Sequence, residues 1–318
     1  MAFNTDNFIK DAVSEIKSKI GNEKAIIALS GGVDSFTAAA LASKAIPNQL
    51  FCVFVDTGLM RKDEPKNVSL AAKKAGVKLK SIDASKEFFK SLKGVIDPEK
   101  KRKIIGELFI RVFEKEAKKD KVAFLIQGTI APDWIESGGM GRDTIKSHHN
   151  VAGLPNKMNL KLCEPLRELY KHEVRMVAEK LGLPISIFNR QPFPGPALAV
   201  RTVGEVTQER AEITRNACAI VEDELEKAAK ENLMEIPWQY FAALLPTKTV
   251  GVRGDERSYQ YTVVVRAVRS LDGMTANFSN IPNEVLQKIS TRITNEIREV
   301  GRVVYDITNK PPGTIELE

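Results

Sequence analysis

Short, uniformly apolar runs alternate with helix-forming segments over the first 126 residues, and this alternation restricts the possible folds most. The apolar runs lie at 24–29, 50–55 and 122–126, and the segment 77–82 is predicted to be a half-buried strand. Segments with apolar residues at helical spacing lie at 8–20, 35–44, 65–75 and 98–118. Apolar strands that alternate with helices are typical of a parallel sheet covered on both faces. We therefore predict an α/β domain built on a parallel sheet.

Polar residues and glycines follow these predicted strands at one common edge. Ser30 follows the first apolar run, Asp56 follows the second, and Gln127-Gly128 follows the last. In open parallel sheets the ligand lies beyond the carboxyl ends of the strands. The agreement in position predicts a binding site at this edge.

The segment Ser30-Gly31-Gly32-Val33-Asp34-Ser35 joins the first predicted strand to a helix N-terminus. Two glycines let the backbone approach an anion, and the free N–H groups and dipole of the following helix favour negative charge. The segment lacks the lysine of a Walker A loop. Asp34 would repel a phosphate directly, which indicates a bridging Mg²⁺ ion. From these residues alone, a structural glycine turn capped by Ser35 is the alternative.

The regular patterns stop between about 131 and 159, and a loop of this length is usually either a functional lid or disordered. A helix is predicted again at 171–181. The proline-rich segment at 191–196 suits neither a helix nor an interior strand, so we place a boundary before it, between domains 1–190 and 191–318. The second domain is predicted to be a small α+β unit, with helices at 208–230 and 283–299 and strands at 249–252, 259–268 and 302–308.

Composition narrows the class of protein only in part. The net charge of +7 suits either nucleic acid or phosphorylated small molecules, and no nucleic-acid-binding motif is present. Cys52, Cys163 and Cys218 lack the spacing of a zinc site or a disulfide framework, which favours a reducing compartment. No apolar run approaches the roughly 20 residues of a membrane span, and the N-terminal segment does not read as a signal peptide. We expect a cytoplasmic protein with neither a nucleic-acid nor a membrane partner.

The SGGxDS loop is the signature of the ATP pyrophosphatases, which cleave ATP between its α and β phosphates and adenylate a substrate oxygen. From about residue 20 to the last residue, the chain also resembles the synthetase portion of GMP synthetases. The motifs that carry this resemblance lie at 54–61, 127–129, 132–137, 145–150, 190–196, 248–252 and 310–316. The last of them separates this family from NAD synthetases, argininosuccinate synthetases and tRNA-thiolating enzymes. The resemblance implies an adenine nucleotide α-hydrolase-like domain followed by a C-terminal dimerisation domain.

The resemblance also implies a reaction: the C2 oxygen of xanthosine monophosphate (XMP) attacks the α-phosphate of ATP-Mg, and ammonia then displaces AMP to give GMP. The residues implied to hold ATP are Ser30, Gly31, Gly32, Val33, Asp34, Ser35, Val55 and Gly128, with Asp34 also at the Mg²⁺ ion. The implied catalytic residues of the lid are Asp133, Glu136, Lys146, His148 and His149. Among these, we expect Lys146 to be the cation that stabilises the adenylyl transition state.

Simpler interpretations of the lid residues remain open on the residues alone. Lys146 could be a solvated loop lysine, and Asp133 and Glu136 could be the acidic first turn of a helix. The adjacent His148 and His149 lack the spacing of a zinc motif.

Five residues are implied to bind XMP: Arg102, Asp255, Lys310, Thr314 and Glu316. A lysine suits a 5′-phosphate, and a carboxylate suits the N–H donors of a purine. The alternatives are a solvated helix turn for the basic cluster around Arg102 and a frayed terminus for the residues around Lys310.

The chain departs from the family pattern at four positions, one of which places Leu317 where tryptophan is usual. Ala152 and Ala197 replace glycines, and either alanine would be strained if its φ were positive. His172 stands where an acid is more usual.

The resemblance also suggests partners. Many GMP synthetases begin with a glutamine amidotransferase domain, but only about 20 residues precede the first predicted strand here. We therefore expect ammonia from a separate amidotransferase partner chain, and a homodimer formed through the C-terminal domain. Two alternative functions remain open on the sequence. The chain could be an ATP pyrophosphatase that adenylates tRNA, or a non-catalytic nucleotide-binding partner in a larger assembly.

Overall fold

The computed structural model describes residues 3–132, 160–188, 190–271 and 273–318, and it divides into two compact units. The first unit consists of Met1–Asp56, Asp63–Ala84 and Gly106–Arg190. The second consists of Thr57–Lys62, Ser85–Ile105 and Gln191–Glu318. The basic cluster around Arg102 therefore belongs to the second unit, although it precedes most of that unit in sequence.

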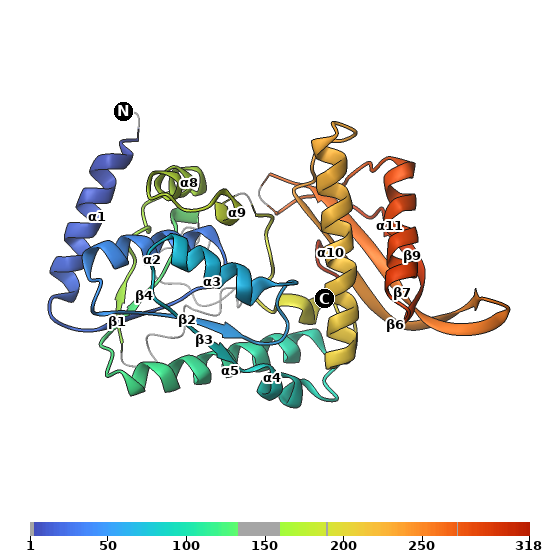
Figure 1. Ribbon diagram of the computed structural model, residues 1–318, viewed down its shortest axis with the longest axis horizontal. Helices are drawn as coiled ribbons and strands as arrows, with labels where there is room; N and C mark the ends of the chain where they lie inside the picture. Colours follow the sequence, from blue (N-terminus) through green and yellow to red (C-terminus); the bar gives the residue numbers. More distant parts are fainter. Residues whose placement is uncertain (1–2, 133–159, 189, 272) are drawn as a thin grey trace. The chain divides into compact units, whose positions relative to one another are not determined.

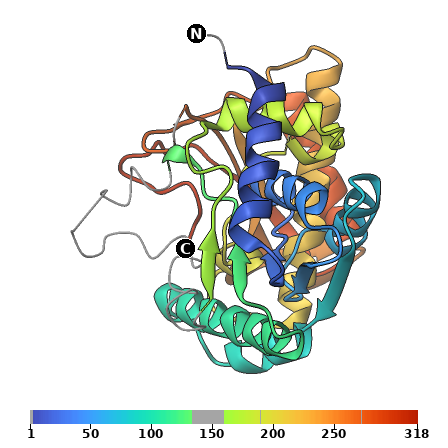
Figure 2. The same ribbon diagram turned by 90° about the vertical axis from the view of Figure 1, so that its left-hand side faces the viewer.

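The first unit contains a five-stranded sheet in the order β3-β2-β1-β4-β5, and all neighbouring pairs are parallel. Its strands are β1 (Ala25–Ala28), β2 (Leu50–Asp56), β3 (Leu79–Asp83), β4 (Phe124–Ile126) and β5 (Lys161–Cys163). The predicted parallel sheet is thus confirmed. The short strand β5, which lies beside β4 in Figure 2, was not predicted.

Helices cover both faces of this sheet. In Figure 1, α2 (Val33–Ala45) and α3 (Glu64–Lys74) lie on one side and α5 (Pro98–Lys119) lies on the other. Helices α1 (Thr5–Ile20) and α8 (Lys171–Lys180) pack against α2 and against each other. Because α2 is rich in alanine and most of its residues are buried, it can lie between these helices and the sheet.

The strand order reverses beside β1. The chain moves outward from β1 through β2 to β3, and then returns through α5 to place β4 on the other side of β1. Such a reversal opens a crevice beyond the carboxyl ends of the two central strands. The segment Ser30–Ser35 and the pair Gln127-Gly128 follow those two strand ends.

The second unit is built on a long antiparallel hairpin. Strands β6 (Gln239–Arg253) and β7 (Glu256–Arg269) form it, with the two-residue β8 (Asn277–Phe278) antiparallel and β9 (Val300–Asp306) parallel to β7. Helix α10 (Gln208–Lys230) packs on β6, and α11 (Asn283–Glu296) packs on α10 and β9 (Figure 1). The prediction of a small α+β unit is confirmed.

Strand β6 begins ten residues earlier than predicted. Its first part, Gln239–Leu244, is buried, and the register with β7 shifts between Leu244 and Lys248. Pro246 lies in that interval, and a proline cannot donate a hydrogen bond within a sheet. The proline therefore hides the first part of this strand in the sequence, so that only the part after Pro246 is predicted.

Three short helices complete the described chain: α4 (Ser85–Leu92), α9 (Ile185–Phe188) and the 3-10 turn η1 (Ala197–Val200). Helix α4 was not predicted. Within the described residues, no helix is both long enough and apolar enough to cross a bilayer.

Ala197, one of the two alanines that the resemblance predicts to stand in place of glycine, has a φ of 57°. A side chain in this left-handed region costs about 1–2 kcal/mol, whereas glycine adopts it without steric strain. Ala152 lies outside the described residues.

Replacing Ala197 with glycine should therefore stabilise the chain by about 0.5–1 kcal/mol, because relief of strain exceeds the extra chain entropy of glycine. Thermal unfolding followed by circular dichroism measures this as a rise in the midpoint. Ala199→Gly, in the same turn without a positive φ, should lower the midpoint instead. A lower midpoint for Ala197→Gly would contradict the strain argument.

Candidate active site

The Ser30–Ser35 segment forms a closed turn at the start of α2. The Ser35 hydroxyl donates to the Gly32 carbonyl at 3.0 Å and lies 3.1 Å from the Ser30 hydroxyl, and the Ser30 N–H donates to it at 3.3 Å. Gly32 is the N-cap of α2 and carries no side chain to cap the helix. The N–H groups of the first helical turn are therefore available to an anion.

Position 31 requires both the backbone conformation and the small size of glycine. The φ of Gly31 is +84°, and an added Cβ would overlap a carboxylate oxygen of Glu64. The Glu64 carboxylate is paired with Arg190 through two hydrogen bonds of 2.5 and 2.8 Å, and Arg190 also donates to the Gly31 carbonyl at 3.2 Å. This ion pair supports the loop from the side of its carbonyl groups.

Gly128 supports the loop from β4. A Cβ at this position would lie 2.7 Å from the backbone carbon of Asp34 and 2.9 Å from the Ser35 nitrogen. Only glycine lets the end of β4 lie this close to the first turn of α2. The residue predicted at the ATP site therefore lies directly beside the loop.

Asp34 lies at the start of α2, where its carboxylate meets the ammonium group of Lys171 at 2.5 Å. Its other oxygen, Oδ1, is buried and has no hydrogen-bond partner among the described residues. A carboxylate oxygen with no partner, beside free helix N–H groups, suits Mg²⁺, which usually binds through one or two carboxylates plus phosphate oxygens. The residues present therefore fit the predicted metal, although the described residues contain no cluster of three or more acidic, His or Cys ligands.

Lys171 is a site residue that the sequence analysis did not identify. It is the first residue of α8 and lies 137 positions from Asp34, so no local pattern relates the two. The next residue, His172, is exposed and its ring stacks on Tyr170 at 6.3 Å between centroids. Val55 is buried near the end of β2. The predicted lid residues Asp133, Glu136, Lys146, His148 and His149 lie outside the described residues.

The second unit binds its own C-terminal segment through buried charges. Lys101, the residue before Arg102, is fully buried, forms an ion pair with the Glu318 carboxylate, and donates to the Thr202 carbonyl at 3.0 Å. Burial lowers the pKa of Lys101, against the opposing effect of Glu318. Arg102 donates to the main-chain oxygen of Glu318 at 2.7 Å. The basic cluster on α5 is therefore not simply a solvated turn, because two of its cations hold this segment.

Glu316 is held more firmly still. Arg201 donates to its carboxylate from Nε at 3.0 Å and from Nη2 at 2.9 Å, and Gln239 adds a third bond of 2.7 Å. The residues after Lys310 are thus packed against the second unit, in contrast to the alternative of a frayed terminus.

The other predicted XMP residues also lie in the second unit. Lys310 donates to the Gly273 carbonyl at 2.7 Å, and the Thr314 hydroxyl donates to the Glu316 carbonyl at 2.5 Å. Asp255 is exposed at the tip of the β6–β7 hairpin.

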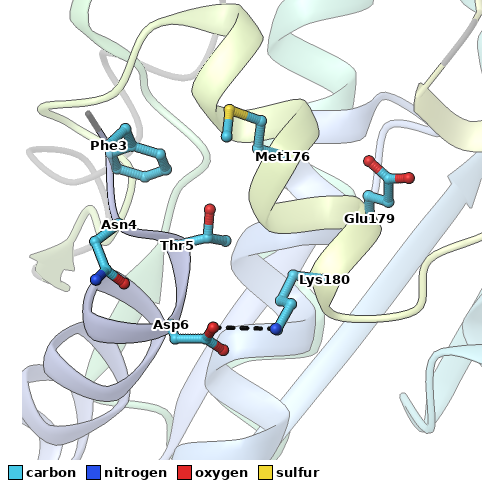
Figure 3. Close-up of a pocket in the computed structure, with 7 residues that line it drawn as sticks. All are labelled: Phe3, Asn4, Thr5, Asp6, Met176, Glu179 and Lys180. Carbon is cyan, nitrogen blue, oxygen red and sulfur yellow. Dashed lines mark ion pairs between the residues drawn. The ribbon is translucent and has the colours of Figure 1, made fainter.

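A hollow elsewhere on the first unit is lined by the start of α1 and by α8: Phe3, Asn4, Thr5, Asp6, Met176, Glu179 and Lys180 (Figure 3). An ion pair of 3.0 Å joins Lys180 to Asp6 across it. None of the lining residues belongs to the Ser30–Ser35 loop or to its described supports.

Two family models match the chain. The model described as "NAD synthase" matches residues 3–112, which include the Ser30–Ser35 loop. The model described as "GMP synthase C terminal domain" matches residues 226–317.

Curated relatives match over almost the whole chain. A protein of Thermococcus kodakarensis, named as one subunit of "GMP synthase [glutamine-hydrolyzing]", is 62% identical, covering 98% of this chain and 99% of the relative. The protein of the same name from Pyrococcus horikoshii is 61% identical, covering 98% of both. "GMP synthase [glutamine-hydrolyzing]" of Thermotoga maritima is 56% identical over 98% of this chain, but only 62% of that relative is covered.

Replacing Lys171 with methionine should raise the KM for ATP about tenfold, the effect of losing roughly 1.4 kcal/mol. Without the ammonium group, the charge of Asp34 would face the anionic phosphates directly. Pyrophosphate release at varied ATP concentration measures the effect.

Lys180→Met on the same helix is the matched control. Lys180 pairs with Asp6, and both residues line the hollow between α1 and α8, which contains no residue of the Ser30–Ser35 loop. The KM of this control variant for ATP should stay within about twofold of the unaltered chain. Equal KM values for the two variants would show that the Lys171–Asp34 pair has no part in ATP binding.

Proposed function

This chain belongs to the family of glutamine-hydrolysing GMP synthases, as their synthetase subunit, and on that basis we propose how its two units share the conversion of XMP to GMP. The first unit, together with the lid at about 131–159, would bind and activate ATP. The second, which includes 191–318, would bind XMP and form the dimer. The observation that carries this proposal is the Ser30–Ser35 loop, which presents helix N–H groups where the strand order reverses.

The ATP half of the proposal rests on the electrostatics of this loop. The N–H groups at the start of α2 and the Ser30 and Ser35 hydroxyls would hold the pyrophosphate portion of ATP. Lys171 would offset part of the phosphate charge. Mg²⁺ held at Asp34 would supply positive charge to the phosphate oxygens. Val55 and the main chain near it would contact the adenine.

The reaction itself would consist of two displacements. The C2 oxygen of XMP would attack the α-phosphate of ATP and expel pyrophosphate, which gives an adenylated XMP. Ammonia would then attack C2 and expel AMP, which leaves GMP. Asp133, Glu136, Lys146, His148 and His149 would act in these steps, with Lys146 stabilising the charge that develops on the α-phosphate.

The XMP half of the proposal rests on the C-terminal segment. Arg102 and Lys310 supply cations for the 5′-phosphate, and Glu316 supplies an acceptor for purine N–H groups. Thr314 and Asp255 complete the proposed set.

We propose that ammonia reaches the chain from a separate glutamine amidotransferase subunit. The names of the archaeal relatives, each given as one subunit of the enzyme, support this. All three cysteines are buried, and burial raises the pKa of Cys52 to about 12 and that of Cys163 to about 11. No thiol here is therefore suited to attack glutamine at neutral pH. Free cysteines also support a cytoplasmic location.

The second unit has an exposed apolar surface that supports the proposed homodimer. Val250 and Tyr259 are directly opposite one another on β6 and β7 and are 50% and 70% exposed, and Val252 is 78% exposed. Adjacent apolar side chains on a sheet face are typical of protein interfaces. Light scattering should give twice the chain mass of 35.3 kDa, and a mass of one chain at working concentration would refute the dimer.

The reaction can be tested with the purified chain alone. Incubation with Mg-ATP, XMP and ammonium should release one pyrophosphate for each GMP formed, and omission of XMP should abolish the release. Glutamine in place of ammonium should give no GMP until the amidotransferase partner is added. GMP formation from glutamine by this chain alone would overturn the assignment of ammonia to a partner. Pyrophosphate release that needs tRNA instead of XMP would support a tRNA-adenylating enzyme.

A further inference from the structure

Arg201, the residue after η1, has no role in the proposed function, yet its environment is unusual. It has no exposed surface, and its guanidinium group makes two hydrogen bonds to the carboxylate of Glu316, at 3.0 and 2.9 Å. A two-point contact of this kind fixes the plane of the carboxylate as well as its position.

Two aromatic rings hold the guanidinium group in place. Its central carbon lies 4.1 Å from the ring centre of Phe241 and 5.0 Å from that of Phe193. Phe193 belongs to the proline-rich segment 191–196, whose function the sequence did not indicate. Arg201 therefore cannot turn away from Glu316 without losing both aromatic contacts.

The remaining bonding capacity of Glu316 can be counted. A carboxylate has about two acceptor positions on each oxygen. Oε1 accepts from Arg201 and from Gln239, whereas Oε2 accepts only from Arg201 among the described residues. One acceptor position therefore remains on Oε2, and the side chain of Glu316 keeps 16% of its surface exposed.

The charge of Arg201 is also fixed. Burial alone would lower the pKa of Arg201, but the adjacent Glu316 raises it above its ordinary value. The guanidinium group of Arg201 thus stays charged.

We propose that Arg201 is a positioning residue for XMP: it orients Glu316 so that the remaining acceptor on Oε2 faces a ring N–H of the purine. This inference rests on the proposed role of Glu316 in binding XMP. Recognition of the purine base then depends on the buried Arg201 as well as on the carboxylate of Glu316.

Arg201→Lys tests this idea, because lysine keeps the charge but lacks the planar two-point contact. The KM for XMP and its Kd by calorimetry should rise about tenfold, while the KM for ATP and kcat at saturating XMP stay within about twofold. Arg292→Lys is the matched control. Among the described residues, Arg292 pairs with acidic groups of α10 and α11, namely Asp223, Glu224 and Glu296.

Phe193→Leu provides a second variant that keeps the ion pair and removes one aromatic contact of Arg201. It should raise the KM for XMP about two- to fivefold with kcat unchanged. Arg201→Lys fails to fold if its thermal midpoint lies far below that of Arg292→Lys. In that case, the KM of Phe193→Leu for XMP tests the positioning role.

Glu316→Gln separates this inference from the proposal beneath it. If Glu316→Gln leaves XMP binding unchanged, the role of Glu316 is wrong, and the positioning role has no basis. If Glu316→Gln weakens XMP binding but Arg201→Lys and Phe193→Leu do not, only the positioning role is overturned. Equal losses of XMP and ATP affinity in Arg201→Lys, with a lower thermal midpoint than the control, would show a general structural role and also overturn it.

Discussion

The close approach of Gly128 to the first turn of α2 is the constraint on which the first unit depends. Because β4 ends against the backbone of Asp34 and Ser35, the start of α2 is held where the strand order reverses. The Glu64–Arg190 pair supports the same loop from its carbonyl side. Main-chain fit and a partly buried ion pair together hold the N–H groups at the start of α2 in place, so little reorganisation would be needed for the proposed binding of phosphate.

The second unit uses buried charge where the first uses close main-chain fit. Lys101 and Arg201, both without exposed surface, hold Glu318 and Glu316 of the same short segment. Taking such charges out of water is costly, so pairs of this kind contribute little net stability. Their value lies in geometry: each carboxylate has one allowed position, which suits the recognition of XMP that we propose for this segment.

The sequence predicted the features that depend on local pattern. The apolar runs and the half-buried segment 77–82 predicted β1 to β4, and the helical spacing of α10 predicted both of its ends. Strand β5 was missed because three residues are too few to show a period, and the start of β6 because Pro246 interrupts it. Lys171, Arg201 and the Glu64–Arg190 pair were missed for another reason. Each depends on a partner more than 100 residues away, which no local pattern records.

The burial of Lys101 has a consequence for how the chain responds to its solvent. Mobile ions weaken interactions between charges that they can surround, and they reach buried pairs much less. Lys101 is fully enclosed and the side chain of Glu318 is only 6% exposed. Concentrated salt, which would weaken surface pairs such as Lys180–Asp6, should therefore leave the attachment of the C-terminal segment largely intact.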